Sequence, residues 1–488
     1  MRQKALVIVA VAAIVGLVAL WGAPGPPVLS DRRTGDPDLA AAARAAVGDP
    51  AGHRGLAVAV VEDGRVRTAG LGDRGAGSPV AADTPFEMGS LGKVLTGMLL
   101  AELAADGTVD PDDTLRDTWP EVSGPVGGVT LAELASHRAG LPKLPITSIG
   151  HGLRLYWANL SAGNPYAGQD AAWIAETTGG RTPGDRRGEV HYSNYGMALL
   201  GQALAARTGQ PYPELLAQRI LRPLGMERTT FAADADQLPA GHADGSTASG
   251  RPAAPWTGTG WAPAGIGGWT TAEDLGKLLA AMLAGTAPGA DAATPRFTED
   301  DRSKIGYGWF TTSYGDQEIV WHNGGTGGFR TYIGFDRSAG RAVALLGNTT
   351  TDVDPIGLRM LGAQAESGDA GEANPLAPLG LLLALGFTLY APAMSWFSGL
   401  RGRDRLGLVS NTLWAALALL LAYRLGDWQT VPGWLWAIGA GLTAAGAVPT
   451  VLRWHDLPTL TGRAPRLRWI SEGFAITFGL AIAIAALT

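Results

Sequence analysis

Residues 86–93, with the sequence FEMGSLGK, decide how the globular part of this chain is interpreted. They open an apolar pattern over 90–105 that predicts a helix ending near Asp106. Ser90 and Lys93 are three residues apart, so their side chains share one face of the first turn. A serine becomes a nucleophile when a base takes its proton, and lysine is such a base when burial or a nearby cation disfavours its charge. The alternative interpretation is a helix-capping serine followed by a surface lysine.

A second polar motif, Tyr192-Ser193-Asn194, stands immediately before another helical pattern at 195–208. A phenol close to an ammonium group has its phenolate form favoured and can pass a proton onward. An asparagine amide can donate to a substrate carbonyl and also hold a lysine. Taken alone, the tripeptide equally fits a packed aromatic residue and a helix cap.

A third motif, HNGGTGGF at residues 322–329, follows a strand that we expect over 318–321. Glycines beside a strand let a substrate backbone approach closely. An exposed N–H group there can join the N–H of Ser90 as an oxyanion hole. Alone, the motif also fits a glycine-rich turn with a solvent-facing histidine.

The pattern around these motifs predicts a sheet with helices. Residues 55–62, GLAVAVVE, form an apolar run that ends in the hairpin signal Asp63-Gly64, with a partner strand from Val66 onward. Three further strands are expected at 318–321, 331–335 and 342–347. Strands at the start and end with helices between them indicate an α+β fold, in which helices flank an antiparallel sheet.

In this order, S-x-x-K, Y-x-N and [KH]-x-G resemble the serine β-lactamase and penicillin-binding protein superfamily. The likeness is greatest to its class C branch, which includes D-alanyl-D-alanine carboxypeptidases, D-aminopeptidases and lactamase-like esterases. Auxiliary stretches at 129–142 (VTLAELASHRAGLP), 265–275 (GIGGWTTAEDL) and 297–308 also match that branch. The resemblance covers about 38–362 and implies a β-lactamase/transpeptidase-like domain with a helical subdomain.

The resemblance assigns roles to single residues. Ser90 is the acylated nucleophile, Lys93 its base partner and Tyr192 the proton shuttle, and the N–H groups of Ser90 and Gly325 form the oxyanion hole. The residues assigned to substrate binding are Asn194, His322 and Gly324. No metal or organic cofactor is implied.

The third motif departs from the lactamase pattern. Family lactamases commonly carry K-T-G there, whose lysine and threonine bind the β-lactam carboxylate, whereas residues 322–324 read HNG. A neutral imidazole binds a carboxylate less well than an ammonium, although a protonated one can serve. We therefore expect ester or peptide substrates rather than efficient β-lactam hydrolysis. The stretch 148–188, with Tyr156, Trp157 and Trp173, is a candidate cover for the cleft, and ordinary packing is the alternative.

Apolar segments of membrane-spanning length stand at both ends of the chain. The run 5–21 follows Arg2 and Lys4, which is typical of a secretory signal or an uncleaved anchor, and 22–37 suits a flexible linker. Four more segments, each about 20 residues long, are 376–397, 406–425, 431–452 and 469–487. The expected organisation is a signal or anchor with linker (1–37), the β-lactamase-related domain (38–362), a polar linker (363–375) and four transmembrane helices (376–488).

The loops between these segments predict an orientation. The loop at 427–432 has no Lys or Arg, whereas the two other loops are basic. The basic residues are Arg401, Arg403, Arg405, Arg453, Arg463, Arg466 and Arg468. The positive-inside rule then places both basic loops in the cytoplasm, and the globular domain and C-terminus outside. The alternative is four buried helices of a soluble domain.

Composition excludes several classes of protein. The 488 residues carry a net charge of −6, which argues against a general nucleic-acid binder. The absence of cysteine excludes disulfides, cysteine-ligated zinc, iron–sulfur clusters and a thiol nucleophile.

The sequence thus predicts a membrane-bound, extracytoplasmic serine hydrolase that forms an acyl-enzyme. Its expected substrates are small peptides, amides or esters, cell-wall D-amino-acid peptides among them, and its other partner is the lipid bilayer. An alternative is a sensor that a penicillin or wall fragment acylates without turnover and that signals through the membrane helices. A third alternative is that the four C-terminal helices form a transport or partner module. These segments contain few ionisable residues apart from Glu472, which disfavours transport. The protein partner of the membrane region is unknown.

Overall fold

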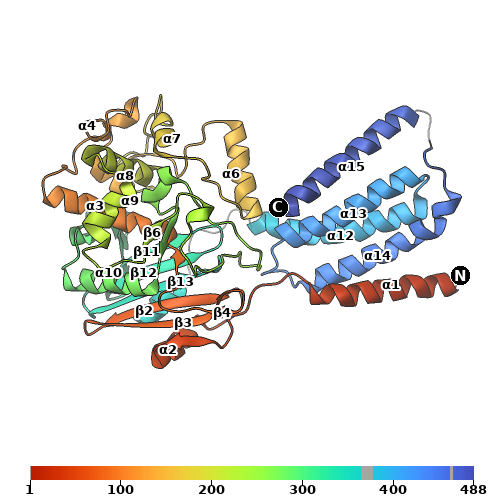
Figure 1. Ribbon diagram of the computed structural model, residues 1–488, viewed down its shortest axis with the longest axis horizontal. Coiled ribbons are helices and arrows are strands. Elements are labelled where there is room, and N and C mark those ends of the chain that lie inside the picture. The colour runs from red at the N-terminus through yellow and green to blue at the C-terminus, as the bar shows by residue number, and fades with distance from the viewer. Residues whose placement is uncertain (1, 364–376, 462–464, 488) are drawn as a thin grey trace. The chain divides into compact units, whose positions relative to one another are not determined.

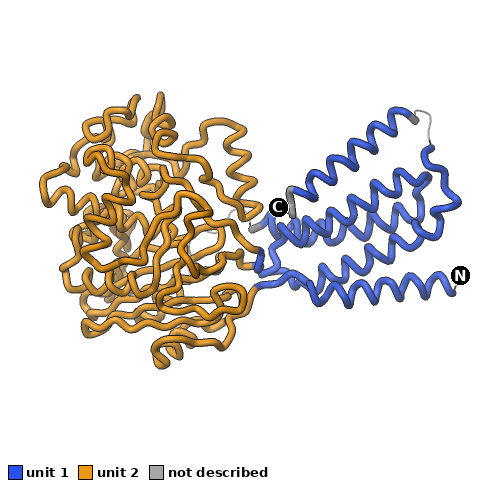
Figure 2. The backbone as a smooth tube through the Cα atoms, viewed as in Figure 1, with its two compact units in different colours: residues 1–26, 249–251, 373–488 blue, residues 27–248, 252–372 orange. Residues whose placement is uncertain are grey.

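A computed structural model describes residues 2–363, 377–461 and 465–487. The chain divides into two compact units, shown in Figure 2. The sheet unit comprises Pro27–Ala248 and Pro252–Glu372, and the helical unit comprises Met1–Pro26, Ser249–Arg251 and Ala373–Thr488. Except for its first residue, the linker expected over 363–375 lies outside the described residues, as does Arg463.

The sheet unit is built on one antiparallel sheet with the strand order β1-β3-β2-β13-β12-β11-β10-β9-β8 (Figure 1). Its strands are β1 (Arg33–Gly35), β2 (Gly55–Glu62), β3 (Arg65–Gly75), β8 (Phe297–Thr298), β9 (Ser303–Ile305), β10 (Phe310–Tyr314), β11 (Gln317–Gly325), β12 (Arg330–Asp336) and β13 (Arg341–Gly347), with β4 (Ser78–Pro79) paired to β3. The predicted β2–β3 hairpin is confirmed. Asp63 and Gly64 both have positive φ, as a type I′ turn requires.

Both faces of this sheet are covered. Along β2, Ala57 and Ala59 belong to the larger core, and Val58 and Val60 belong to the smaller one, as the two-residue period of a strand requires. The larger core contains α3 (Gly92–Ala105), α8 (Asn194–Thr208) and α10 (Ala272–Ala284), and the smaller one contains α2 (Pro37–Val47) and α11 (Asp354–Leu361).

A helical subdomain completes the sheet unit. Its other helices are α4 (Leu115–Thr118), α5 (Leu131–Ala135), α6 (Ile149–Ser161), α7 (Ala171–Glu176) and α9 (Tyr212–Leu216). A small second sheet has the order β5 (Phe86–Glu87), β7 (Gly268–Thr270) and β6 (Thr230–Phe231). The expected α+β class, an antiparallel sheet flanked by helices, is confirmed.

The N-terminal stretch 22–37 differs from the flexible linker that we expected. Leu29 is only 1% exposed and belongs to the smaller core. Strand β1 pairs with β3, with Arg33 opposite Leu71. Proline and glycine content alone misleads here, because backbone pairing to a distant strand orders the second half of this stretch.

The helical unit contains five helices that are long and apolar enough to cross a membrane, within the described part of the chain. They are α1 (Arg2–Trp21), α12 (Ala377–Arg401), α13 (Arg405–Leu425), α14 (Trp434–Arg453) and α15 (Pro465–Leu487). Helix α1 packs closely on α14, since a Cβ added at Gly441 would lie 2.6 Å from the carbonyl oxygen of Ala12. Small residues permit such close approach between membrane helices.

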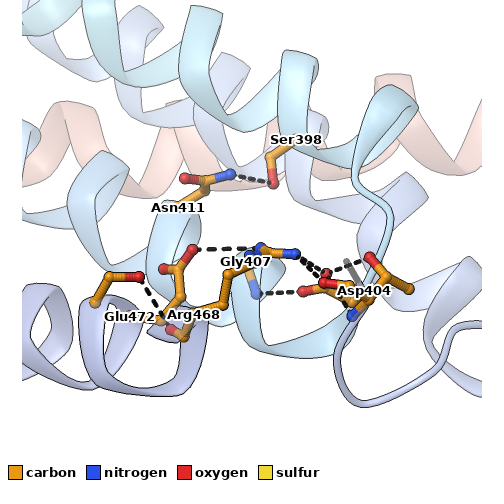
Figure 3. A network of polar contacts seen from close by, with 8 residues as sticks. Ser398, Asp404, Gly407, Asn411, Arg468 and Glu472 are labelled. Carbon is orange, nitrogen blue, oxygen red and sulfur yellow. Dashed lines mark hydrogen bonds and ion pairs between the residues drawn. The ribbon is translucent and has the colours of Figure 1, made fainter. Parts of the chain in front are cut away.

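A polar network joins α15 to the start of α13, as Figure 3 shows. The Asp404 carboxylate caps α13 by accepting the N–H of Gly407 at 3.0 Å, and it forms an ion pair with Arg468 at 2.7 Å. Arg468 also lies 3.5 Å from Glu472, one turn further along α15. Glu472, which the sequence singles out as an ionisable residue near the start of its segment, is thus part of an ion-pair network.

Replacing Gly97 of α3 tests the packing beneath the site. An alanine Cβ there would overlap the carbonyl oxygen of Tyr307, and helix backbone has little room to move in a dense core. We expect Gly97→Ala to destabilise the sheet unit by about 1–3 kcal/mol, measured as a lower midpoint of thermal unfolding in detergent. Gly128→Ala is the control, because nothing lies within 4 Å of the added Cβ. Equal midpoints for both variants would contradict this packing.

Candidate active site

The turn that carries Ser90 depends on close contacts between glycines. Gly89 has a φ of 53°, and a Cβ added to it would lie 2.8 Å from the amide nitrogen of Gly325. Gly265 has a φ of 95°, and a Cβ there would overlap the carbonyl oxygen of Gly89. Glycine therefore lets three backbone segments meet at the N-terminal end of α3.

Ser90 and Lys93 form a hydrogen-bonded pair. The Lys93 Nζ lies 2.7 Å from the Ser90 Oγ and donates a second hydrogen bond to the carbonyl oxygen of Ala264 at 3.1 Å. Ser90 is partly exposed, whereas Lys93 is fully buried. Burial, and then repulsion from the Lys143 ammonium, hold the pKa of Lys93 well below its ordinary value. A neutral amine at this distance can take the serine proton.

The Tyr192 ring lies beside the same lysine. Its centroid is 4.9 Å from the Lys93 Nζ, 4.7 Å from the His137 ring centroid and 6.1 Å from that of His322. The next residue, Ser193, caps α8 by accepting the N–H of Gly196 at 2.9 Å. The cap fixes the backbone that presents Tyr192 to the lysine.

Asn194 is the first residue of α8 and does not hold Lys93 as we expected. The two hydrogen bonds of Lys93 go instead to Ser90 and to the carbonyl oxygen of Ala264. The Oδ1 of Asn194 is buried without a hydrogen-bond partner among the described residues. The Asn194 side chain also forms a hydrogen bond with Tyr166.

His322 is buried on β11 and neutral. Its side chain is 1% exposed, and its Nδ1 lies 2.5 Å from the carbonyl oxygen of Asn323. Burial, followed by repulsion from Lys93, lowers the pKa of His322 to about 3. The protonated imidazole considered above as a carboxylate partner is therefore wrong for this site at neutral pH.

The end of β11 lies directly against the Ser90 turn. A Cβ at Gly324 would lie 3.1 Å from the Ser90 nitrogen, and the Thr331 hydroxyl on β12 donates to the Met88 carbonyl oxygen at 2.9 Å. Strand β10 pairs with β11 only as far as Trp321, so among the described strands the stretch 322–325 has a partner on one edge alone. The Ser90 turn therefore contacts the end of β11 beside an open strand edge, where we expect the oxyanion hole.

Sequence reasoning missed two charged residues near the site. Lys143 is exposed, and its Nζ lies 5.8 Å from the Tyr192 ring centroid. The sequence could have indicated Lys143, because this residue directly follows the auxiliary stretch 129–142 that resembles the family. Glu87 is 2% exposed and accepts the N–H of Trp256 at 2.6 Å, and burial raises its pKa to about 7.

The described residues contain no group of three or more His, Asp or Glu side chains able to hold a metal ion.

The beta-lactamase family model matches residues 41–366, which is most of the chain. The chain belongs to the beta-lactamase family. Apart from residues 249–251, the matched residues fall in the sheet unit, which we call the beta-lactamase domain.

Individual relatives agree with this assignment. The chain is 29% identical over 192 residues to the D-alanyl-D-alanine-carboxypeptidase/endopeptidase AmpH of Escherichia coli K12, which is 38% of this chain and 47% of AmpH. It thus spans about half the length of the curated relatives it matches. Two crystal structures share the fold with TM-scores of 0.55. The class C beta-lactamase of Rhodobacter sphaeroides is 22% identical and covers 66% of this chain and 98% of its own. The D-alanine carboxypeptidase AmpC of Burkholderia cenocepacia is 23% identical and covers 67% and 99%.

Removing the charge of Lys143 tests its effect on Lys93. A nearby cation disfavours protonated Lys93, so Lys143→Gln should raise the pKa of Lys93 and move the acid limb of the kcat/KM–pH profile to higher pH. Lys143→Arg keeps the charge and should leave the limb in place. An unmoved limb in Lys143→Gln, or one moved to lower pH, would show that Lys143 does not tune Lys93.

Proposed function

We propose that this chain is a membrane-bound, extracytoplasmic serine hydrolase that acts on peptide, amide or ester bonds through an acyl-enzyme. The observation that carries the proposal is the 2.7 Å contact between the buried Lys93 Nζ and the partly exposed Ser90 Oγ. A buried neutral base beside an accessible hydroxyl is the arrangement that nucleophilic catalysis by serine needs.

The proposed reaction has two steps. In acylation, Lys93 takes the Ser90 proton, the Oγ bonds to the substrate carbonyl carbon, and the N–H groups of Ser90 and Gly325 stabilise the developing oxyanion. Tyr192 passes the proton to the leaving group as the scissile bond breaks. In deacylation, a water molecule adds to the acyl ester, gives up a proton to the Lys93–Tyr192 pair, and releases the acid as Ser90 recovers its proton.

One feature favours peptide substrates over simple esters. The Oδ1 of Asn194 has no donor among the described residues, and the N–H of a peptide supplies one, which a simple ester lacks. The neutral His322 offers no cation in the third motif to a substrate carboxylate, whether of a β-lactam or of a C-terminal D-amino acid. Cell-wall D-amino-acid peptides are therefore the substrate class we propose, in line with the carboxypeptidase name of AmpH.

Turnover by matched serine variants tests the proposal. Ser90→Ala should lower kcat for a D-alanyl-D-alanine peptide and a p-nitrophenyl ester by at least about 1,000-fold, because no nucleophile remains. Ser338→Ala, an exposed serine in the β12–β13 turn, should hydrolyse both substrates like the wild type. Lasting Ser90-dependent labelling by penicillin without any turnover would favour the sensor instead. Hydrolysis that persists in Ser90→Ala would contradict both.

Contacts within the helical unit support the orientation that the loops predict. At one end, the N–H of Asp427 donates to the carbonyl oxygen of Gly380 at 3.0 Å, in the loop region without Lys or Arg. At the other end, Arg453 donates to the carbonyl oxygen of Gly399 at 2.8 Å, and Arg405 donates to that of Trp454 at 2.9 Å. The basic loops thus gather at one end of the helices, which we propose is the cytoplasmic end.

The packing of α1 supports an anchor rather than a removed signal. Gly441 of α14 approaches Ala12 and Gly16, and Gly433 lies against Pro24. The C-terminal end of α1 therefore lies at the end of the unit opposite the basic loops. We propose that α1 is a fifth membrane helix that leads out of the cytoplasm into the beta-lactamase domain.

Single cysteines test the orientation, because the chain has none of its own. Gln429→Cys, in the loop without basic residues, should react with a membrane-impermeant maleimide in intact spheroplasts. Arg403→Cys should react only after the membrane is permeabilised, since we place its loop in the cytoplasm. The reverse pattern would invert the proposed topology and put the beta-lactamase domain inside.

A further inference from the structure

Helix α6 leaves one apolar face uncovered in the sheet unit. His151 and Leu155 are buried, at 4% and 8% exposure, and fix the helix to the domain. The exposed apolar side chains are Ile149 (85%), Leu153 (64%), Tyr156 (45%) and Trp157 (43%). Their spacing of four, three and one residues places them on one face of the helix, which we call the α6 stripe. Figure 1 shows α6 at the outside of the sheet unit.

The composition of the α6 stripe and its surroundings suits a lipid surface. Residues 144–163 contain no Asp or Glu, and Arg154 is their one charged residue apart from histidine. Anionic lipid headgroups therefore meet no acidic side chain on this segment that would repel them. Tyr156 and Trp157 are of the aromatic types that concentrate at the membrane–water boundary. Apolar patches that stay exposed on a folded domain mark interaction surfaces, so this face needs a partner.

The tether to α1 keeps a membrane within reach. Helix α1 ends at Trp21, and the sheet unit begins at Pro27. The five residues 22–26 span at most about 18 Å when fully extended. A domain held so close to the end of a membrane helix stays beside the lipid surface, whichever way it turns.

We propose that the α6 stripe inserts into the headgroup–acyl boundary of the membrane that α1 crosses, with the helix lying along the surface. The inference rests on the membrane location in the proposed function and not on the chemistry of Ser90. Lys143, beside Tyr192, precedes the α6 cap residue Ser148 by five residues. Docking of α6 therefore turns this side of the cleft toward the lipid surface, where membrane-borne or wall-bound peptides would meet it.

Fluorescence quenching in nanodiscs tests the insertion. The full-length chain carries a single Leu153→Cys substitution labelled with an environment-sensitive fluorophore, in discs of phosphatidylethanolamine and phosphatidylglycerol. Asp316→Cys, in the exposed β10–β11 turn, is the matched control, and Ile149→Cys gives a second position on the stripe. Doxyl-labelled lipids should quench the stripe labels about twofold or more and leave the control bright, since the stripe would lie 5–10 Å into the boundary. Aqueous iodide should do the opposite.

Three outcomes decide the matter. Lipid quenching at both stripe positions supports insertion, even if Ser90-dependent hydrolysis is absent, and that combination would count against the catalytic proposal alone. Iodide quenching equal to that of the Asp316 label overturns insertion. Protection from both quenchers also overturns it, because a protein surface then covers the stripe. A cooperative thermal unfolding transition like that of the unlabelled protein establishes that the domain is folded in the last two cases.

Discussion

The contact between the Lys93 amine and the Ser90 hydroxyl is the constraint on which the rest of the site depends. It is useful only if the lysine is uncharged, and full burial is what removes its charge. Burial in turn requires the dense packing of α3 against its neighbours, including the glycine contact at Tyr307. Since a buried amine still needs a partner, the carbonyl oxygen of Ala264 takes its second hydrogen bond. The packing that stabilises the fold around α3 thus also keeps Lys93 uncharged for catalysis.

The neighbouring groups follow from that one requirement. A carboxylate beside Lys93 would favour the protonated form of the amine. The side chains beside it are instead the rings of Tyr192, His137 and His322. Burial and the proximity of Lys93 keep both histidines uncharged by lowering their pKa values. Two cations lie near the site: Lys143 is exposed, and the Arg330 guanidinium stands beside Gly325, where an added Cβ would lie 2.8 Å from its Nη1. This distribution distinguishes the site from one that binds carboxylates through a lysine on β11.

Local patterns predicted much of the fold and the core of the site. The β2–β3 hairpin is encoded in Asp63-Gly64, and α3 and the long apolar helices are encoded in their own periodicity. The S-x-x-K spacing sets the Ser90–Lys93 contact within a single helical turn. Features that depend on distant partners could not be read in this way. The pairing of Arg33 with Leu71, the packing of α1 on α14 and the burial of His322 arise only when remote segments meet. The composition and local spacing of residues do not report which distant segments come into contact.

The pH dependence of a single covalent turnover at Ser90 tests the central claim most directly. Wild-type protein would be mixed with an excess of fluorophosphonate, and the rate of adduct formation at Ser90 followed by intact mass and peptide mapping across the pH range. If Lys93 is a buried neutral base, the rate constant should reach its plateau well below 10.5, the ordinary pKa of lysine. A rate constant that climbs until pH 10.5, or an adduct on another residue, would contradict the account.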